Sequence, residues 1–272
     1  MTMRALVAAV QMVSGPEVGD NLAQAAALLE EAAAAGARLA VLPENFALLG
    51  SDEHDKLDIA ETDGNGPVQA FLAEQARRHG IWLVGGSVPL RSEEAERVYS
   101  ACLVYDSAGE RRARYDKIHL FDVEVGAQEA YCESRTVKPG RLQPVLVDTP
   151  FGRLGLSICY DVRFPELFRR LVAEGMELLA IPSAFTATTG AAHWQTLVRA
   201  RAIENQCFVI APGQGGEHPG GRRTHGESMI VGPWGEMLAR LDKGPGVALA
   251  EINLEALHQL RRRFPALTHR RF

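Results

Sequence analysis

Cysteine is scarce in this chain, and its spacing matches no metal-binding pattern. The four cysteines are Cys102, Cys132, Cys159 and Cys207. None of them are spaced as C-x-x-C, and no pair of histidines complements them, so the sequence argues against a structural zinc site. We therefore expect free thiols in a reducing cytoplasm, where they are available for chemistry.

Long apolar runs and a strong charge bias are also missing. No run approaches the length of a membrane span, and the opening segment, residues 1–12, lacks the apolar core and cleavage site of a signal peptide, so it is interpreted as a first strand. A net charge of −5 argues mildly against a nucleic-acid partner. At 272 residues with 46% hydrophobic residues, the composition is that of an ordinary globular protein, which needs no disulfide or metal to hold its core.

Buried strands alternate with helices along the chain. The pattern predicts strands at residues 4–11, 39–42 and 81–88, a hairpin of 98–105 with 113–118, a helix at 21–35 that Asp20 caps, and a helix at 67–78 that Gly80 ends. Strands alternating with helices are typical of α/β layers, and the hairpin makes the sheets mixed.

The second half of the sequence repeats the first. The segment ARLAVLPENF (37–46) aligns with MELLAIPSAF (176–185), and further pairs follow: 4–11 with 153–160, 81–85 with 207–211, and 101–117 with 227–243. Two equivalent units would each lay helices on one sheet face and press the bare faces together. We therefore predict a four-layer α-β-β-α sandwich with two mixed sheets and a pseudo-two-fold repeat, forming a single domain over 1–272.

One stretch, LGLSICYDVRFPELFRR (154–170), concentrates the signals of a catalytic site. An apolar strand ends at Cys159, the chain turns, and a helix begins at Pro165. A cysteine close to a helix N-terminus suits a nucleophile, because the dipole and free N–H groups favour a thiolate and an oxyanion. The alternative is that Cys159 is one more buried, inert cysteine.

Three charged residues are further candidates. Glu44 follows the Pro-ended strand in an apolar setting, and the repeat would bring it near Cys159, where it suits a general base. Lys117 is followed by IHLFD, which suggests burial, whereas its repeat counterpart Lys243 is followed by GPG and is expected to be exposed. Glu133 lies in the loop YCES. Each of the three could instead be an ordinary solvated charge.

Taken together, these motifs resemble those of the nitrilase superfamily of carbon–nitrogen hydrolases. The resemblance extends from Leu6 to about Phe264 and rests on LPENF (42–46), YDKIHLFDVE (115–124), CES (132–134), ICYDVRFPEL (158–167), IPSAFTATTGAAHW (181–194) and RARAIENQCFV (199–209). It implies the same four-layer fold, with Glu44 as general base, Lys117 as oxyanion donor, Cys159 as nucleophile and Glu133 holding the lysine and substrate. It also implies no metal or organic cofactor, and a homodimer to which the tail 261–272 contributes.

Within the superfamily the chain resembles the Nit branch of amidases. Two Nit subgroups are similar to it: one hydrolyses deaminated glutathione, and the other, the omega-amidases, hydrolyses 2-oxoglutaramate and 2-oxosuccinamate. The segments YCES, RAIENQCFV, Gln214–His218 and the ending LRRRFPALTHRRF resemble the first group more. The expected reaction is cleavage of a linear amide through a cysteine thioester with release of ammonia.

A 2-oxo acid amide as the small-molecule substrate calls for an anion-binding group near the pocket. Arg163 is our candidate for the carboxylate contact, with a structural arginine as the alternative. The Tyr160 N–H is expected beside Lys117 at the oxyanion. Phe185, Thr186 and Thr188 are expected in the pocket wall. The segment Gly213–Gly221 with Arg222 and Arg223 is interpreted as a mobile loop that could close over a longer substrate, or as a plain flexible connection.

Two other kinds of function stay open at this point. Cys159 could work with His119 or His193 in a Cys–His hydrolase. The same fold could also serve as a non-catalytic binding module with a relic pocket. The presence of Glu44, Lys117 and Glu133 together with Cys159 favours the amidase.

Overall fold

The first sheet contains the N-terminal strand next to one of its edges. The computed structural model describes residues 4–126 and 129–271, and this sheet runs in the order β15-β1-β2-β3-β5-β4, with β6 also paired to β5. Its strands are β1 (Arg4–Gln11), β2 (Leu39–Val41), β3 (Trp82–Val84), β4 (Val88–Arg91), β5 (Val98–Tyr105), β6 (Arg111–Asp116) and β15 (Gly246–Asn253). The β1-β2-β3 ladder is parallel and the other pairs are antiparallel, so the sheet is mixed, as predicted.

The second sheet repeats this topology. Its order is β14-β13-β12-β11-β10-β9, formed by β9 (Leu146–Thr149), β10 (Gly152–Leu156), β11 (Leu178–Ala180), β12 (Phe208–Ala211), β13 (Met229–Val231) and β14 (Met237–Arg240). The parallel run β10-β11-β12 followed by antiparallel β13 and β14 matches β1-β2-β3 followed by β5 and β6. The internal repeat is therefore confirmed strand by strand.

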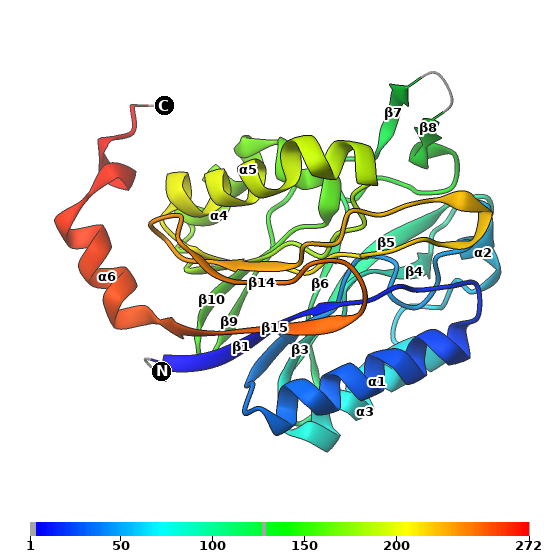
Figure 1. Ribbon diagram of the computed structural model, residues 1–272, viewed down its shortest axis with the longest axis horizontal. Coiled ribbons are helices and arrows are strands. Elements are labelled where there is room, and N and C mark those ends of the chain that lie inside the picture. The colour runs from blue at the N-terminus through cyan, green and yellow to red at the C-terminus, as the bar shows by residue number, and fades with distance from the viewer. Residues whose placement is uncertain (1–3, 127–128, 272) are drawn as a thin grey trace.

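Helices cover the outer face of each sheet. The first sheet carries α1 (Val18–Ala34) and α3 (Pro67–His79), and the second carries α4 (Pro165–Ala173) and α5 (Ala187–Asn205). Figure 1 shows the two helical layers on opposite sides of the stacked sheets. The four-layer α-β-β-α sandwich is confirmed.

Strand β1 shows why the layers stack. Val7 and Ala9 belong to the apolar cluster shared with the second sheet, whereas Ala8 and Val10 belong to the cluster under α1 and α3. Successive side chains of a strand point to opposite faces, and all four of these are buried completely. Burial on both faces explains why the sequence shows a continuous apolar run instead of an alternating pattern.

Two predicted elements differ from the structure. Helix α1 begins at Val18 after Glu17, so Asp20 lies in the first turn instead of capping it, where its carboxylate still suits the helix dipole. The expected strand 81–88 is split into β3 and β4. Gly86 divides it, because its φ of +55° is left-handed and a Cβ there would collide with the carbonyl oxygen of Pro43.

The remaining helices, strands and turns lie outside the two sheets and the four helices that cover them. They are α2 (Asp55–Asp58), the hairpin β7 (Asp122–Gly126) with β8 (Glu129–Cys132), helix α6 (Leu254–Arg263), and short 3₁₀ turns at Glu133–Arg135, Cys159–Arg163, Pro219–Gly221 and Ala266–His269. Within residues 4–126 and 129–271, no helix is long and apolar enough to cross a membrane. Residues 1–3 of the expected first strand and Phe272 of the tail lie outside the described residues.

Candidate active site

The turn after β2 places Glu44. Asn45 has a left-handed φ of +57°, and its N–H donates to Ser87 Oγ at 2.8 Å, on the segment that Gly86 brings against Pro43. The Glu44 carbonyl accepts from Gln214 Nε2 at 3.1 Å, across the interface between the two sheets. Glu44 is therefore held from both halves of the chain, and its side chain is only 5% exposed.

Cys159 follows β10, the strand that pairs with β11 in the second sheet. Its φ of +45° is left-handed, which is unfavourable for a residue with a side chain. Its N–H donates to the Pro182 carbonyl at 2.8 Å, in the segment that follows β11. A backbone held in an unfavourable conformation at a strand end is typical of functional sites.

A buried carboxylate connects the Cys159 turn to the end of β6, which Lys117 directly follows. Asp161 is completely buried, and it accepts the Ile158 N–H at 2.8 Å and the Tyr115 hydroxyl at 2.7 Å. It also accepts the His119 N–H at 3.1 Å and lies 2.7 Å from His119 Nδ1. Since Tyr115 and His119 lie on either side of Lys117, Asp161 fixes the position of the thiol relative to the ammonium.

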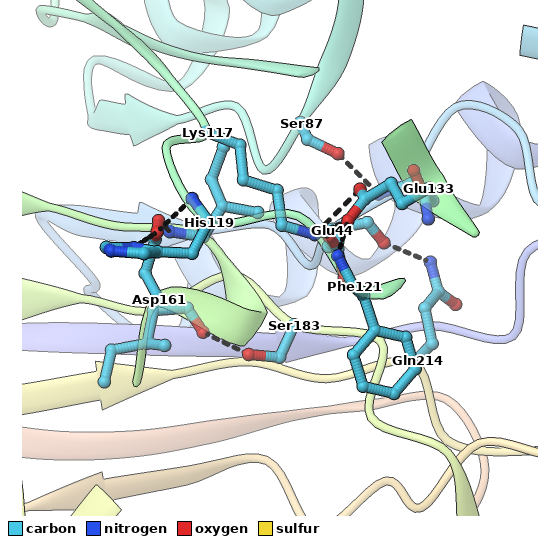
Figure 2. A network of polar contacts seen from close by, with 12 residues as sticks. Glu44, Ser87, Lys117, His119, Phe121, Glu133, Asp161, Ser183 and Gln214 are labelled. Carbon is cyan, nitrogen blue, oxygen red and sulfur yellow. Dashed lines mark hydrogen bonds and ion pairs between the residues drawn. The ribbon is translucent and has the colours of Figure 1, made fainter. Parts of the chain in front are cut away.

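Lys117 lies between two carboxylates in the interior. Its Nζ donates to Glu44 Oε1 at 2.7 Å and to both Glu133 oxygens at 2.9 Å (Figure 2). Glu133 Oε2 is oriented in turn by the Phe121 N–H at 2.7 Å. Burial alone would lower the pKa of Lys117, but Glu133 and Glu44 outweigh it and hold the pKa well above its ordinary value. The lysine is therefore a fixed cation, as its apolar sequence context suggested.

The pKa of the Cys159 thiol differs from the sequence prediction, in which a nearby helix N-terminus favours the thiolate. Burial raises its pKa well above the ordinary value, and the Glu44 charge raises it further, while Lys117 lowers it. The reason is that Cys159 begins a 3₁₀ turn, and helix α4 begins only at Pro165, so no long helix dipole acts on the thiol. At neutral pH the sulfur keeps its proton, and a nucleophile would have to be made by transferring that proton to a base.

These groups meet in one pocket with an empty volume of about 480 Å³. Its wall includes the four expected catalytic residues, the expected Tyr160, Phe185 and Thr186, and a further set: Asn45, Glu53, Lys56, Phe121, Tyr131, Ala184, Thr189 and Arg222. Thr186 also caps α5, since its hydroxyl accepts the Thr189 N–H at 3.2 Å. Thr188 lies instead in an adjoining outer groove.

Arg163, the expected carboxylate contact, is not part of the pocket wall. Its guanidinium lies over the rings of Tyr160 and Phe185, 5.7 and 5.3 Å from their centroids, and its Nη1 lies 3.2 Å from His193 Nδ1. These contacts favour the structural alternative over the predicted carboxylate contact. Arg163 therefore supports Tyr160 and Phe185 instead of facing a substrate.

The geometry also disfavours a Cys–His hydrolase. Among the described residues, neither His119 nor His193 lines the pocket that holds Cys159. His119 is stacked on Phe164 at 3.8 Å and directs Nδ1 to Asp161, and His193 faces Arg163. The described residues also contain no group of three or more His, Cys, Asp or Glu side chains placed to hold a metal ion.

Sequence reasoning missed a charged pair at the pocket mouth. Glu53 lies just before α2 and Lys56 lies within it. The two side chains form a 2.6 Å ion pair, and both line the pocket. Burial would raise the pKa of Glu53, but Lys56, Arg222 and Lys117 lower it below the ordinary value, so the carboxylate is ionised. A four-residue helix with charged residues carries no periodic apolar signal, and nothing in the sequence marked this segment.

Comparison with known proteins places the chain among amide hydrolases. A family model described as carbon–nitrogen hydrolase matches residues 6–262. The chain is 47% identical over 269 residues to the deaminated glutathione amidase of Synechocystis, covering 98% of each chain, and 43% identical to that of Homo sapiens, covering 98% of this chain and 82% of the human one. The crystal structure of the C. elegans NitFhit protein superimposes with a TM-score of 0.92 at 42% identity, over 99% of this chain and 66% of that one.

Proposed function

Because this chain belongs to the carbon–nitrogen hydrolase family and is an amidase that acts on small-molecule amides, we propose that its substrate is deaminated glutathione and its nucleophile Cys159. The observation that carries the mechanism is the buried Lys117 ammonium, hydrogen-bonded to Glu44 and Glu133 in the pocket that Cys159 lines. The substrate assignment is supported by the activity named for the relatives at 43–47% identity.

The first chemical step joins the Cys159 sulfur to the amide carbonyl in a tetrahedral adduct. Glu44 takes the thiol proton from Cys159, the sulfur attacks the amide carbonyl, and the oxyanion is stabilised by Lys117 Nζ and the Tyr160 N–H. Lys117, Glu44, Glu133 and Cys159 together carry one net negative charge, and moving the proton from sulfur to Glu44 leaves this total unchanged. Ionising the buried thiol alone would be costly, because its pKa is raised. Transfer of the proton to Glu44 neutralises one negative charge as the thiolate forms, and this offsets the cost.

The second half of the reaction reverses the proton path. Glu44 returns the proton to the amide nitrogen, the carbon–nitrogen bond breaks, and the acyl group stays on Cys159. Glu44 then removes a proton from water, which attacks the thioester and restores the thiol. Glu133 holds the Lys117 ammonium through both halves without taking a proton.

The identity of the released amine distinguishes the two candidate substrates. Deaminated glutathione carries a keto group in place of the glutamyl amine, so its cleavable amide nitrogen belongs to cysteinylglycine. Ammonia, the amine product expected from the sequence, is released only from a primary amide such as 2-oxoglutaramate. Both substrates transfer the same 2-oxoglutaryl group to Cys159 and both yield 2-oxoglutarate.

A direct assay of 2-oxoglutarate tests the substrate assignment. We expect kcat/KM for deaminated glutathione to exceed that for 2-oxoglutaramate by about tenfold or more, since contacts to the dipeptide worth about 1.4 kcal/mol suffice for that ratio. Ammonia measured in the same reactions should appear only with 2-oxoglutaramate. A preference for 2-oxoglutaramate would make the protein an omega-amidase and overturn the assignment without changing the mechanism.

We also propose that the enzyme is cytoplasmic and forms a single-domain homodimer through α6 and the tail. Support comes from an apolar surface hollow lined by Phe208, Trp234, Leu260 and Phe264, where Trp234 and Phe264 are 63% and 52% exposed and meet edge to face at 5.4 Å. Light scattering should give twice the 29.6 kDa chain mass. The double variant Trp234→Ser with Phe264→Ser should give the mass of one chain, and a wild-type monomer would contradict the proposal.

A further inference from the structure

An outer groove continues from the catalytic pocket. Its empty volume is about 1490 Å³, and five residues line both cavities: Asn45, Glu53, Lys56, Tyr131 and Arg222. The wall of the groove also includes the rest of the segment 219–223, together with Thr188 and Glu129. A substrate whose carbonyl reaches Cys159 can therefore extend its remaining half into this groove.

Arg222 lies at the junction of the two cavities with donors that are not used. Its Nε is buried and has no hydrogen-bond partner among the described residues. Its Nη1 lies 3.6 Å from Glu53 Oε1, too far for a good hydrogen bond, and its guanidinium lies over the Tyr131 ring at 5.4 Å. Buried donors without a partner are rare in folded proteins and require an explanation.

The acidic side chains of the groove, in contrast, are already satisfied. The contacts are Asp52 to His54 Nδ1 at 2.8 Å, Asp55 to the Asp52 N–H at 3.1 Å, Glu53 to Lys56 at 2.6 Å, and Glu129 to the hydroxyls of Tyr131 at 3.0 Å and Thr188 at 3.1 Å. Arg223, also in the groove wall, has no side-chain partner among the described residues. The groove therefore has unused hydrogen-bond donors of positive charge, which suit an anion.

The loop that carries Arg222 is fastened rather than free. His218 is 6% exposed, lies 2.8 Å from the Ser14 carbonyl oxygen through Nδ1, and lies 2.7 Å from Thr224 Oγ1 through Nε2. Gly220 and Gly221, at φ of +74° and +81°, turn the chain directly before Arg222. The guanidinium is thus presented to the groove by a defined turn, in contrast to the mobile loop expected from the sequence.

We propose that the outer groove binds the leaving amine of the substrate and that Arg222 binds its terminal carboxylate. The proposal rests on the proposed function, because cysteinylglycine is the leaving half of deaminated glutathione and ends in a carboxylate. A planar guanidinium can bind that group through two parallel hydrogen bonds. A primary amide such as 2-oxoglutaramate has no leaving half to reach the groove, so Arg222 determines specificity between the two substrates.

The experiment compares three substrates that all release 2-oxoglutarate: deaminated glutathione, the same compound with its glycine carboxylate converted to an amide, and 2-oxoglutaramate. The variants are Arg222→Gln and Arg222→Lys. Arg240→Gln is the matched control, because Arg240 Nη1 lies 3.7 Å from Glu227 in a similar weak ion pair but lines neither cavity. Thermal unfolding of each variant reports whether it folds.

We expect Arg222→Gln to raise KM for deaminated glutathione by about 10- to 100-fold, the range for a hydrogen bond to a charged group. Amidation of the substrate should raise KM of the wild type by a similar factor and that of Arg222→Gln no further. Arg222→Lys should restore part of the loss, and 2-oxoglutaramate should be hydrolysed equally by all variants. If Arg222→Gln does not fold, the KM values of Arg222→Lys and the effect of substrate amidation on the wild type decide whether Arg222 binds the carboxylate.

Two results would overturn the inference while leaving the proposed function intact. An equal loss with 2-oxoglutaramate would assign Arg222 to the 2-oxo acid that both substrates share, and an unchanged KM for deaminated glutathione would remove Arg222 from the site. Failure of the proposed function is visible separately, in a wild type that hydrolyses 2-oxoglutaramate but not deaminated glutathione, and the leaving-group site would be rejected with it.

Discussion

Replacement of Cys159 by alanine is expected to lower kcat by about 10⁴-fold or more, the usual consequence of deleting a nucleophile. No other cysteine is among the residues that line the pocket in the described part of the chain. Wild-type enzyme quenched with acid during turnover should carry a 2-oxoglutaryl group on the peptide that contains Cys159, detected by mass spectrometry. The alanine variant should bind substrate without forming this adduct.

Cys207→Ala is the matched control for that experiment. Cys207 is completely buried, and burial raises the pKa of its thiol to about 12, but it lies outside the pocket. The variant should keep its activity, and Cys207 and Cys102 should react with iodoacetamide far more slowly than Cys159. An acyl adduct on any other residue, or full activity of Cys159→Ala, would reject the proposed nucleophile.

The pH dependence of the labelling follows from the raised pKa of Cys159. A thiol with a raised pKa is protonated at neutral pH, so the alkylation rate should still rise with pH above about 10, where an ordinary thiol has levelled off. Glu44→Gln removes one of the charges that raise this pKa and should move the profile to lower pH. The same variant should lose about 10²- to 10⁴-fold in kcat, because the general base is lost. Its thiol should therefore be alkylated at lower pH than that of the wild type although its turnover is much slower.

The architecture could be predicted because its signals are local. Each parallel strand is buried on both faces and appears as an apolar run, and helix α3 is marked by Gly66-Pro67 at its start and Gly80 at its end. The repeat then ordered the strands, since ARLAVLPENF and MELLAIPSAF contain the matching strands β2 and β11. The same repeat brought the segments after β2 and β10 together, which is how Glu44 and Cys159 were predicted to meet.

What the sequence did not predict depends on contacts between distant segments. Gly86 breaks the expected strand only because Pro43 lies against it. Arg163 lies over the ring of Phe185, which belongs to a Pro-ended segment distant in the sequence. The raised thiol pKa results from burial and from Glu44, whose distance to Cys159 no sequence pattern gives. Local patterns thus identified the catalytic candidates, while the orientation of the substrate-binding side chains required the folded structure.

Replacement of Lys117 by methionine is expected to reduce both activity and stability. Loss of an oxyanion donor should lower kcat by about 10²- to 10³-fold. Because the Lys117 side chain is 2% exposed and its ammonium binds Glu44 at 2.7 Å and Glu133 at 2.9 Å, its removal leaves the buried Glu44 carboxylate and the partly buried Glu133 carboxylate facing each other. Breaking a buried ion pair in this way costs about 3–5 kcal/mol, which corresponds to a decrease in Tm of roughly 10 °C for a chain of this length.

The stability of the Lys117→Met variant is expected to decrease as pH rises. Without Lys117 the two carboxyl groups are more stable when one is protonated, so the folded variant binds more protons than the unfolded chain, and its stability falls as pH rises. The destabilisation should therefore be largest at pH 7–8 and smaller near pH 5. Lys243→Met is the control, because Lys243 matches Lys117 in the repeat but is exposed, and its effect should stay within about 0.5 kcal/mol. A Lys117→Met enzyme with the stability and turnover of the wild type would show that the buried ammonium holds neither the site nor the oxyanion.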